Sequence, residues 1–491
     1  PGPYQYSEMK YSGLPEWLVT EYPQILARNP EGEIVNEISV SYLHPVFLEK
    51  ARRWYEAVIP ILARYTVDHD GPIAMVQFDN ELMGIHYWFT DAYDCNRQAM
   101  GIGEPGGAWP SFLMERYDTI GSLNAAYESG YGSFEEVFPI HPPARCATQS
   151  RRLKDYQDFY FSAAARYAQI LCGWLRELGM QVPIVHNSPN PNANSTFLEI
   201  RDALGEGFLL GSDHYYNLNI GWEQNNPTPQ YALRCFYSNE MLRLMGYPPT
   251  VFELPGGSPS EFPPIAPGDL KAAYYANTAM GMKGHNYYIF TGGENPFHLG
   301  SNGRYYDFCA PVSAAGEVRP SYEIIREYHA FLHENEWLAG AGMEADFYVG
   351  LDWESTRSSF YSASGVSRAK AWEFTRNGIL LTAFGTSYSP QLVDLSGELP
   401  TDKPLMLAVF SGMERSLQEK LVAFLKAATG LPPPFPDRRN RRALHCLGGL
   451  LGSKFPLTAA TPCPDDGATG YPCSRPGSTR WRLPSAYHRL G

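Results

Sequence analysis

The stretch IAMVQFDNELMG, residues 73–84, joins a short apolar run to a polar cluster and indicates the fold of the chain. Residues 73–76 have the length and composition of a buried strand, and a continuous apolar run is typical of a parallel strand covered on both faces. Asp79, Asn80 and Glu81 follow directly, and α/β folds place their chemistry at the carboxyl ends of such strands. Glu81 is therefore either a functional carboxylate or an exposed loop acid, and the rest of the chain has to decide between the two.

Four more apolar runs end in polar or aromatic residues, and helical segments separate them. We predict these strands at 182–187, 208–214, 250–254 and 285–291. Strands that alternate with helices predict βαβ units and a parallel sheet. With 73–80 as a further strand, we predict an α/β fold in which residues 1–340 form a (β/α)₈ TIM barrel. On this reading we expect the chain to open at Pro1 in the loop after a further strand, and the first two strands of the barrel to be absent from this sequence.

The pattern changes after residue 340. Strands at 346–353, 391–395 and 404–410, with helices near 366–383 and 416–428, predict a small, incomplete, doubly wound α/β domain of flavodoxin- or amidotransferase-like type over 341–430. Residues 431–491 are basic and rich in Pro, Arg, Cys and Gly, without strand or helix periodicity. We interpret this tail as disordered, or as the product of a reading-frame change.

Composition excludes several classes of function. The 491 residues carry a formal net charge of -13, which argues against nucleic acid as a partner, and no run of 18 apolar residues predicts a membrane span. None of the eight cysteines forms a CxxC pair, so we expect no metal site and no cofactor. Scattered thiols favour the cytoplasm, although the N-terminus begins in mid-motif and leaves the compartment unknown. The protein could also form a homo-oligomer, which the sequence does not decide.

Two glutamates stand at predicted strand ends, Glu81 after the fourth barrel strand and Glu253 after the seventh. Retaining glycosidases need two carboxyl groups about 5–5.5 Å apart, one as acid/base and one as nucleophile. Asn80 suits a hydrogen bond to the 2-hydroxyl of a sugar. The chain also has 33 Tyr and 10 Trp, which make good walls for hydroxyl-rich ligands. The pattern therefore favours a glycosidase without a metal.

Several longer motifs resemble known β-galactosidases. PGPYQYSEMKYSGLPEWL (1–18), NYYIFTGGENPF (286–297) and YYDFCAPVSAAGEVRPSY (305–322) resemble motifs of glycoside hydrolase family 35. VQFDNELMG (76–84) resembles the acid/base motif of family 35 and of family 42. FLMERYDTIGSLNAAY (112–127) and the doubly wound region that follows the barrel are closer to family 42.

This resemblance implies roles for individual residues. Glu81 matches the acid/base, and Glu253 matches the nucleophile by its position after strand seven. Phe308 stands where the family usually has a substrate-contacting tyrosine, which removes a hydroxyl group. The candidate substrate-binding residues are Tyr4, Glu8, Asn80, Asn187, Tyr215, Tyr288 and Tyr306. Glu240, by contrast, is expected to be a surface acid.

We therefore predict a retaining glycosidase that releases terminal β-D-galactose through a glycosyl-enzyme, with a galactoside or oligosaccharide as its partner. A β-glucosidase or β-arabinosidase on the same scaffold is the alternative, because the same carboxylate pair serves each sugar. A non-catalytic carbohydrate-binding relative is a third alternative, and the presence of both carboxylates disfavours it. The sequence does not specify the sugar, the linkage or the oligomeric state.

Overall fold

The computed structural model describes residues 13–84, 86, 94–142, 144–215, 229–257, 266–295, 304–307, 309–357, 369–408 and 413–429. All of these residues belong to one compact unit of the chain. Tyr4, Glu8, Phe308 and the tail 431–491 lie outside the described ranges, so the roles assigned to them stay predictions. The domain boundaries at 340 and 430 are also still predictions.

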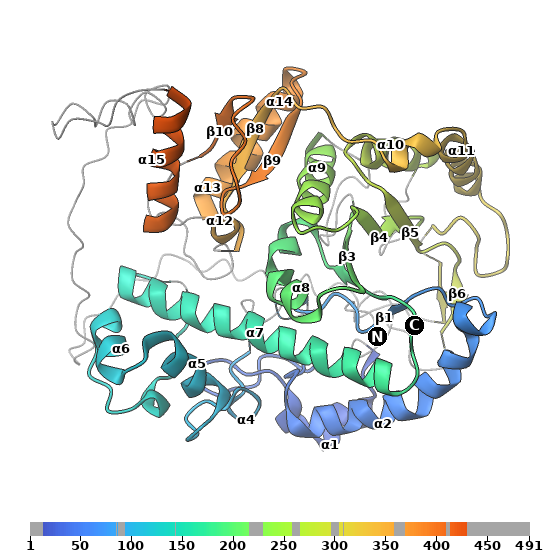
Figure 1. Ribbon diagram of the computed structural model, residues 1–491. Helices are drawn as coiled ribbons and strands as arrows, with labels where there is room; N and C mark the ends of the chain where they lie inside the picture. The colour runs from blue at the N-terminus through green and yellow to red at the C-terminus, as the bar shows by residue number, and fades with distance from the viewer. Residues whose placement is uncertain are drawn as a thin grey trace, which may run out of the picture. The chain divides into compact units, whose positions relative to one another are not determined.

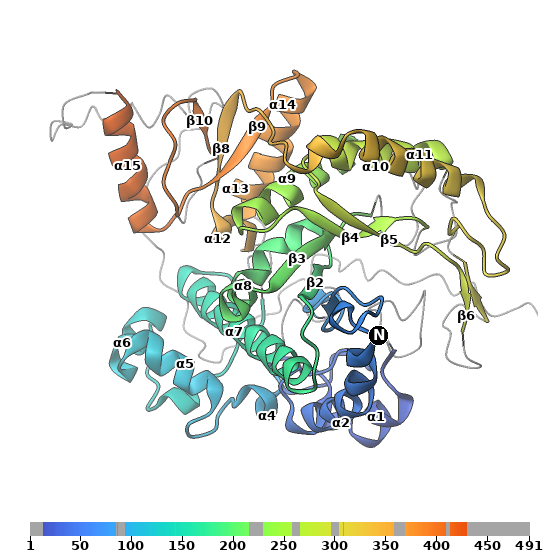
Figure 2. The ribbon, with the colours of Figure 1, turned by 45° about the vertical axis from the view of Figure 1, so that its right-hand side comes forward.

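Five parallel strands form the central sheet, and each strand pairs with its predecessor in the chain (Figures 1 and 2). They are β1 (Val76–Gln77), β2 (Ile184–Ser188), β3 (Phe208–Asp213), β4 (Thr250–Pro255) and β5 (Gly284–Tyr288). This sequential order in a curled sheet confirms the α/β fold of the TIM-barrel type. The carboxyl ends of all five strands consequently lie at the same edge of the sheet.

The first strand is shorter than predicted. Residues 73–80 were expected to be extended, but β1 contains only Val76 and Gln77. Ile73 instead forms an isolated bridge with Thr66, and the backbone turns at Asp79, where φ is 150°. The chain therefore leaves the sheet before Glu81.

Helices separate the strands, as the sequence predicted. Long α7 (Ala147–Glu177) lies between β1 and β2, and it ends before Gly179, which has a φ of 101° that favours glycine. The other helices between or after the strands are η6 (Pro191–Phe197), α8 (Leu198–Leu204), α9 (Pro229–Leu244), α10 (Pro267–Ala279), α11 (Pro320–Glu334) and η7 (Glu336–Ala339). Proline at the first turn of α10 and α11 suits a helix start, because that position has no intrahelical N–H bond to lose.

The segments before β1 and between β1 and α7 form smaller elements. These are α1 (Glu16–Glu21), η2 (Pro23–Ile25), α2 (Pro45–Leu62), η3 (Ala63–Tyr65), η4 (Val67–His69), α4 (Arg97–Met100), α5 (Ala108–Tyr117), α6 (Ile120–Tyr127) and η5 (Phe134–Glu136). Their apolar side chains join the largest core cluster with those of α7, through buried residues such as Trp109, Tyr156 and Phe78. This packing fixes the region that carries the loop after β1.

A second parallel sheet follows, with strand order β10-β8-β9 (Figure 1). Its strands are β8 (Phe347–Leu351), β9 (Pro390–Asp394) and β10 (Leu405–Met406), close to the predicted positions. Its helical segments are α12 (Trp353–Arg357), α13 (Ala369–Phe374), the π-helical η9 (Thr375–Leu380), α14 (Leu381–Gly385) and α15 (Arg415–Thr429). A short antiparallel hairpin, β6 (Gly293–Glu294) with β7 (Tyr305–Tyr306), lies after β5. No helix in the described ranges has both the length and the hydropathy needed to span a membrane.

Glu240 is not the surface acid that the sequence suggested. It is 5% exposed on α9, and its Oε2 accepts a hydrogen bond of 2.8 Å from the backbone N–H of Leu392 in β9. Arg243 donates to both oxygens of Glu240 at 2.7 and 2.8 Å, and also to the carbonyl oxygen of Leu392. Glu240 is spaced in the sequence for an i,i+3 ion pair with Arg243 within one helix. In the structure, the same residue also joins α9 to the second sheet through Leu392.

Candidate active site

Glu81 lies in a tight turn after β1, with a backbone φ of 46° that few non-glycine residues adopt. Three side chains from other segments hold this turn by accepting consecutive backbone N–H groups. The acceptors are Asn187 Oδ1 for Glu81 (3.0 Å), His186 Nε2 for Leu82 (2.9 Å) and Tyr42 Oη for Met83 (3.1 Å). Such strain is maintained only where the surroundings enforce it, so the turn fixes the direction of Glu81.

His186 supports the turn as a neutral ring. It is fully buried on β2, and burial lowers its pKa to about 3. Its Nε2 therefore accepts the N–H of Leu82 and carries no proton. These contacts give His186 a structural role.

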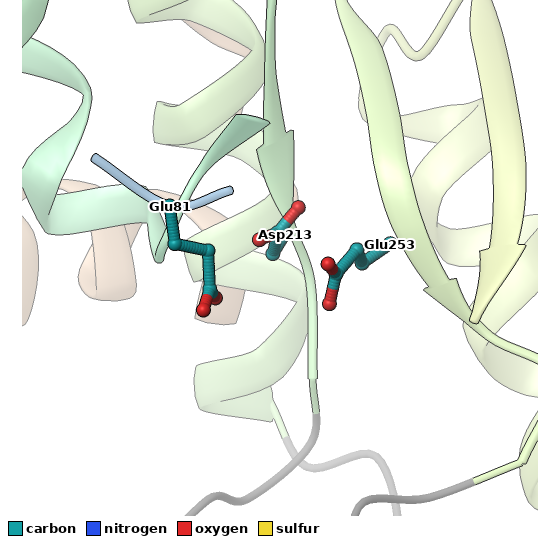
Figure 3. Close-up of side chains that lie close together, drawn as sticks. All are labelled: Glu81, Asp213 and Glu253. Atoms are coloured by element: carbon teal, nitrogen blue, oxygen red, sulfur yellow. The ribbon is translucent and has the colours of Figure 1, made fainter. Parts of the chain in front are cut away.

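The structure brings Glu81 and Glu253 together, and it adds a third carboxyl group, Asp213 (Figure 3). One carboxylate oxygen of each residue lies within 4.8 Å of the other two. Asp213 ends β3 and stands in register with Glu253 on β4, while Glu81 reaches the group from the loop after β1. The spacing of the two glutamates fits that of a retaining pair, about 5–5.5 Å.

Asn187 connects the members of this group. Its Nδ2 donates to Glu253 Oε1 at 3.0 Å, to Asp213 Oδ2 at 2.8 Å and to Asn80 Oδ1 at 3.1 Å. Its Oδ1 accepts from the backbone N–H of Glu81 and from Gln77 Nε2 at 2.8 Å. The side chain is fully buried and its polar atoms are engaged by protein groups, so these contacts favour positioning over direct contact with a substrate.

Asn80 and Tyr215 also lie at the carboxyl group. Asn80 Nδ2 is 3.4 Å from Glu81 Oε2, and the Tyr215 hydroxyl donates to Glu253 Oε2. Burial and the negative charge of Glu253 raise the pKa of Tyr215 well above its usual range, which keeps the hydroxyl protonated as a donor. Tyr288 packs edge-on against Tyr215, with ring centroids 6.0 Å apart. Tyr306 lies on the separate β6–β7 hairpin.

Sequence reasoning missed Asp213. Its signal is present in FLLGSDHYY, a predicted strand that ends in polar residues, but the candidate residue from this strand end was Tyr215. Burial, and then the charge of Glu253, raise the pKa of Asp213 well above its usual range. Three carboxyl groups at this spacing also form an oxygen cluster of the type that binds cations. However, the N–H groups of Asn187 already donate to two of its members, which suits hydrogen bonding more than metal binding.

The curled parallel sheet thus carries two glutamates and an aspartate at its carboxyl edge. The family model of glycoside hydrolase family 42, described as β-galactosidase, matches residues 11–300, and the chain therefore belongs to this family. The comparisons do not support the resemblance of several motifs to family 35.

Similar proteins carry several names. A β-1,2-glucosyltransferase of Ignavibacterium album is 28% identical over 364 residues, which cover 72% of this chain and 49% of that protein. An exo-β-D-glucosaminidase of Thermococcus kodakarensis is 28% identical over 444 residues, which cover 87% of this chain and 55% of that protein. The chain thus spans about half the length of the curated relatives that it matches.

The fold is shared with solved family members. The β-galactosidase from Bacillus circulans sp. alkalophilus superimposes with a TM-score of 0.63 at 17% sequence identity, covering 84% of this chain and 58% of that one. At this level of identity the match shows the fold alone.

Proposed function

We propose that this chain carries the catalytic site of a retaining β-glycosidase that releases terminal β-D-galactose. The observation that supports this most is the approach of Glu81 and Glu253, whose nearest carboxylate oxygens lie within 4.8 Å at the carboxyl edge of the barrel sheet. Inverting enzymes need a wider gap of about 6.5–9.5 Å to admit a water molecule between the carboxyl groups. The short spacing therefore favours a covalent intermediate.

The two glutamates have different surroundings, and these support different roles. Glu253 receives hydrogen bonds from Asn187 and from the Tyr215 hydroxyl, which stabilise an ionised nucleophile. In the first step, Glu253 bonds to the anomeric carbon while Glu81 gives its proton to the leaving oxygen. In the second step, Glu81 takes a proton from water, which attacks the same carbon and releases Glu253.

Asn80 is positioned to assist at the sugar. It lies beside Glu81, and its Oδ1 accepts hydrogen bonds from Gln77 Nε2 and Asn187 Nδ2. These contacts fix the amide plane, so that its Nδ2 points toward the Glu81 carboxylate. A fixed amide beside the acid suits the 2-hydroxyl contact that strengthens in the transition state. Neither step calls for a cofactor.

The proposed preference for galactose has weaker support than the proposed catalytic role of Glu81 and Glu253. The family description and the solved neighbours name β-galactosidases, which favours galactose. Two relatives are named for glucosyl and glucosaminide chemistry, which favours the alternative of another β-glycosidase on this scaffold. Both carboxylates are present and close together, which disfavours a binding protein without activity.

A panel of nitrophenyl β-glycosides, assayed with the full chain, tests the proposal. We expect release of nitrophenol, with the β-D-galactoside giving the highest kcat/KM among galactoside, glucoside, glucosaminide and arabinoside. A higher value for another sugar would refute galactose specificity and leave the carboxylate pair standing. Failure to cleave any of the four would refute activity for this chain.

A further inference from the structure

Asp213 is the one carboxyl group of the cluster to which the proposed reaction gives no part. It is 1% exposed at the end of β3, and Figure 3 shows it between Glu81 and Glu253. It is the register partner of Glu253 across the two strands. A buried acid in this place is costly unless it is neutralised or paired, so its presence needs a reason.

The surroundings of Asp213 favour a proton on its carboxyl group. Its Oδ2 accepts a hydrogen bond of 2.8 Å from Asn187 Nδ2, whereas its buried Oδ1 has no hydrogen-bond partner among the described residues. A carboxylate oxygen of Glu81 lies within 4.8 Å of one of Asp213, and two carboxyl groups can hydrogen-bond each other only when one of them carries a proton. Within the described part of the chain, no lysine or arginine forms an ion pair with Asp213 that would neutralise its charge instead.

Repulsion between like charges also favours a protonated Asp213. Three carboxyl groups within 4.8 Å of one another cannot all be ionised in a buried site. Glu253 has to be ionised to act as a nucleophile, and Glu81 has to carry a proton to act as an acid. A further negative charge on Asp213 would add repulsion toward Glu253 without a compensating partner.

We propose that Asp213 is a positioning residue that works as a neutral carboxylic acid. It donates its proton within the cluster while its other oxygen accepts from Asn187, and it thereby holds Glu81 and Glu253 at their spacing without adding charge. This inference rests on the proposed glycosidase function.

Two substitutions separate a neutral role from a charged one. Asp213→Asn keeps one donor, one acceptor and the neutral state, so kcat/KM should stay within about tenfold of wild type. Asp213→Ala removes both contacts, and we expect a fall of about 100-fold, the cost of misplacing reacting groups by about 1 Å. Ser212→Ala is the matched control, because Ser212 is the adjacent, equally buried residue of β3 and is not a member of the carboxyl cluster.

The pH dependence distinguishes the two states of Asp213 further. If Asp213 is neutral, Asp213→Asn removes no charge and the alkaline limb of the kcat/KM profile stays in place. If Asp213 is ionised, its removal makes Glu81 release its proton more easily, and the alkaline limb moves to lower pH by about one unit or more. A purely structural role would lower activity without moving either limb and without rescue by asparagine.

Infrared spectroscopy tests the protonation state without turnover. Protein with ¹³C-labelled aspartate carboxyl groups is compared with Asp213→Asn at neutral pH. We expect the wild-type protein to show a protonated-carboxyl band that is absent from the variant. A difference confined to the carboxylate band would overturn the inference, as would loss of activity in Asp213→Asn equal to that in Asp213→Ala. If the wild-type chain hydrolyses no glycoside, the proposed function fails while the infrared result still decides the state of Asp213.

Discussion

Truncation of Asn187 to alanine should damage both the stability and the activity of the protein. The side chain is fully buried and makes five hydrogen bonds, three through Nδ2 and two through Oδ1. The substitution leaves an oxygen of Glu253 without this donor, and the backbone N–H of Glu81 without its acceptor. Asn187 thus contacts all three members of the carboxyl cluster.

The expected magnitude follows from these bonds. A hydrogen bond to a charged group contributes about 1.5–3 kcal/mol and a neutral one about 1 kcal/mol. One bond to ionised Glu253 and the two bonds accepted by Oδ1 therefore give a loss of roughly 3–5 kcal/mol in the free energy of unfolding. Activity should fall by about 100-fold in kcat, because both glutamates lose part of what orients them.

The assay pairs chemical denaturation with steady-state kinetics on a nitrophenyl glycoside. Asn194→Ala is the control, because Asn194 is equally buried and donates two hydrogen bonds to Ser238 away from the carboxyl groups. It should destabilise the protein by about 1–3 kcal/mol and leave kcat nearly unchanged. Equal kcat values for the two variants, after correction for the folded fraction, would refute the role given to Asn187.

Three further outcomes can be checked independently. Glu240→Ala should lower the free energy of unfolding by about 2–3 kcal/mol in a urea titration, since it leaves the backbone N–H of Leu392 without its acceptor. The control Glu323→Ala breaks an exposed i,i+3 ion pair of the same kind and should cost less than about 1 kcal/mol. Equal losses in the two variants would contradict this prediction. Burial raises the pKa of Asp94 to about 6, compared with about 3.9 for an unfolded aspartate. The folded protein therefore holds this proton up to a higher pH than the unfolded chain does, and the free energy of unfolding should fall by about 3 kcal/mol as the pH rises from about 4 to about 6. Asp94→Asn should lack this part of the pH dependence, and an unchanged pH profile would count against it. Turnover should survive a chelator, because amide N–H groups donate to the carboxyl cluster, and restoration of lost activity by zinc or calcium would show the contrary.

The sequence predicted the elements that depend on local pattern. The proximity of Glu81 and Glu253 was predictable because each lies at the end of an apolar run, and the ends of parallel strands meet at one edge of a sheet. The strand positions of both sheets were also close, since apolar runs bounded by polar residues are a short-range signal.

The features that the sequence did not predict depend on distant partners. Asp213 acquires its significance from its register with Glu253, and FLLGSDHYY alone does not reveal that register. The turn at Glu81 is held by Tyr42, His186 and Asn187, of which the last two are more than 100 residues away. Glu240 resembles a local helix pair until Leu392, 152 residues further on, is placed beside it.

The most direct test of the paired glutamates is the anomeric configuration of the glycosyl azides formed by two variants. In Glu81→Ala, a substrate with an activated leaving group should still form the intermediate on Glu253, and azide should then displace it to give the β-glycosyl azide. In Glu253→Ala, azide should occupy the place of the missing nucleophile and give the α-glycosyl azide directly. Proton NMR of each product decides the configuration. This assignment is expected for both variants. The reverse outcome would exchange the two roles, and full activity in either variant without azide would place the catalytic pair elsewhere.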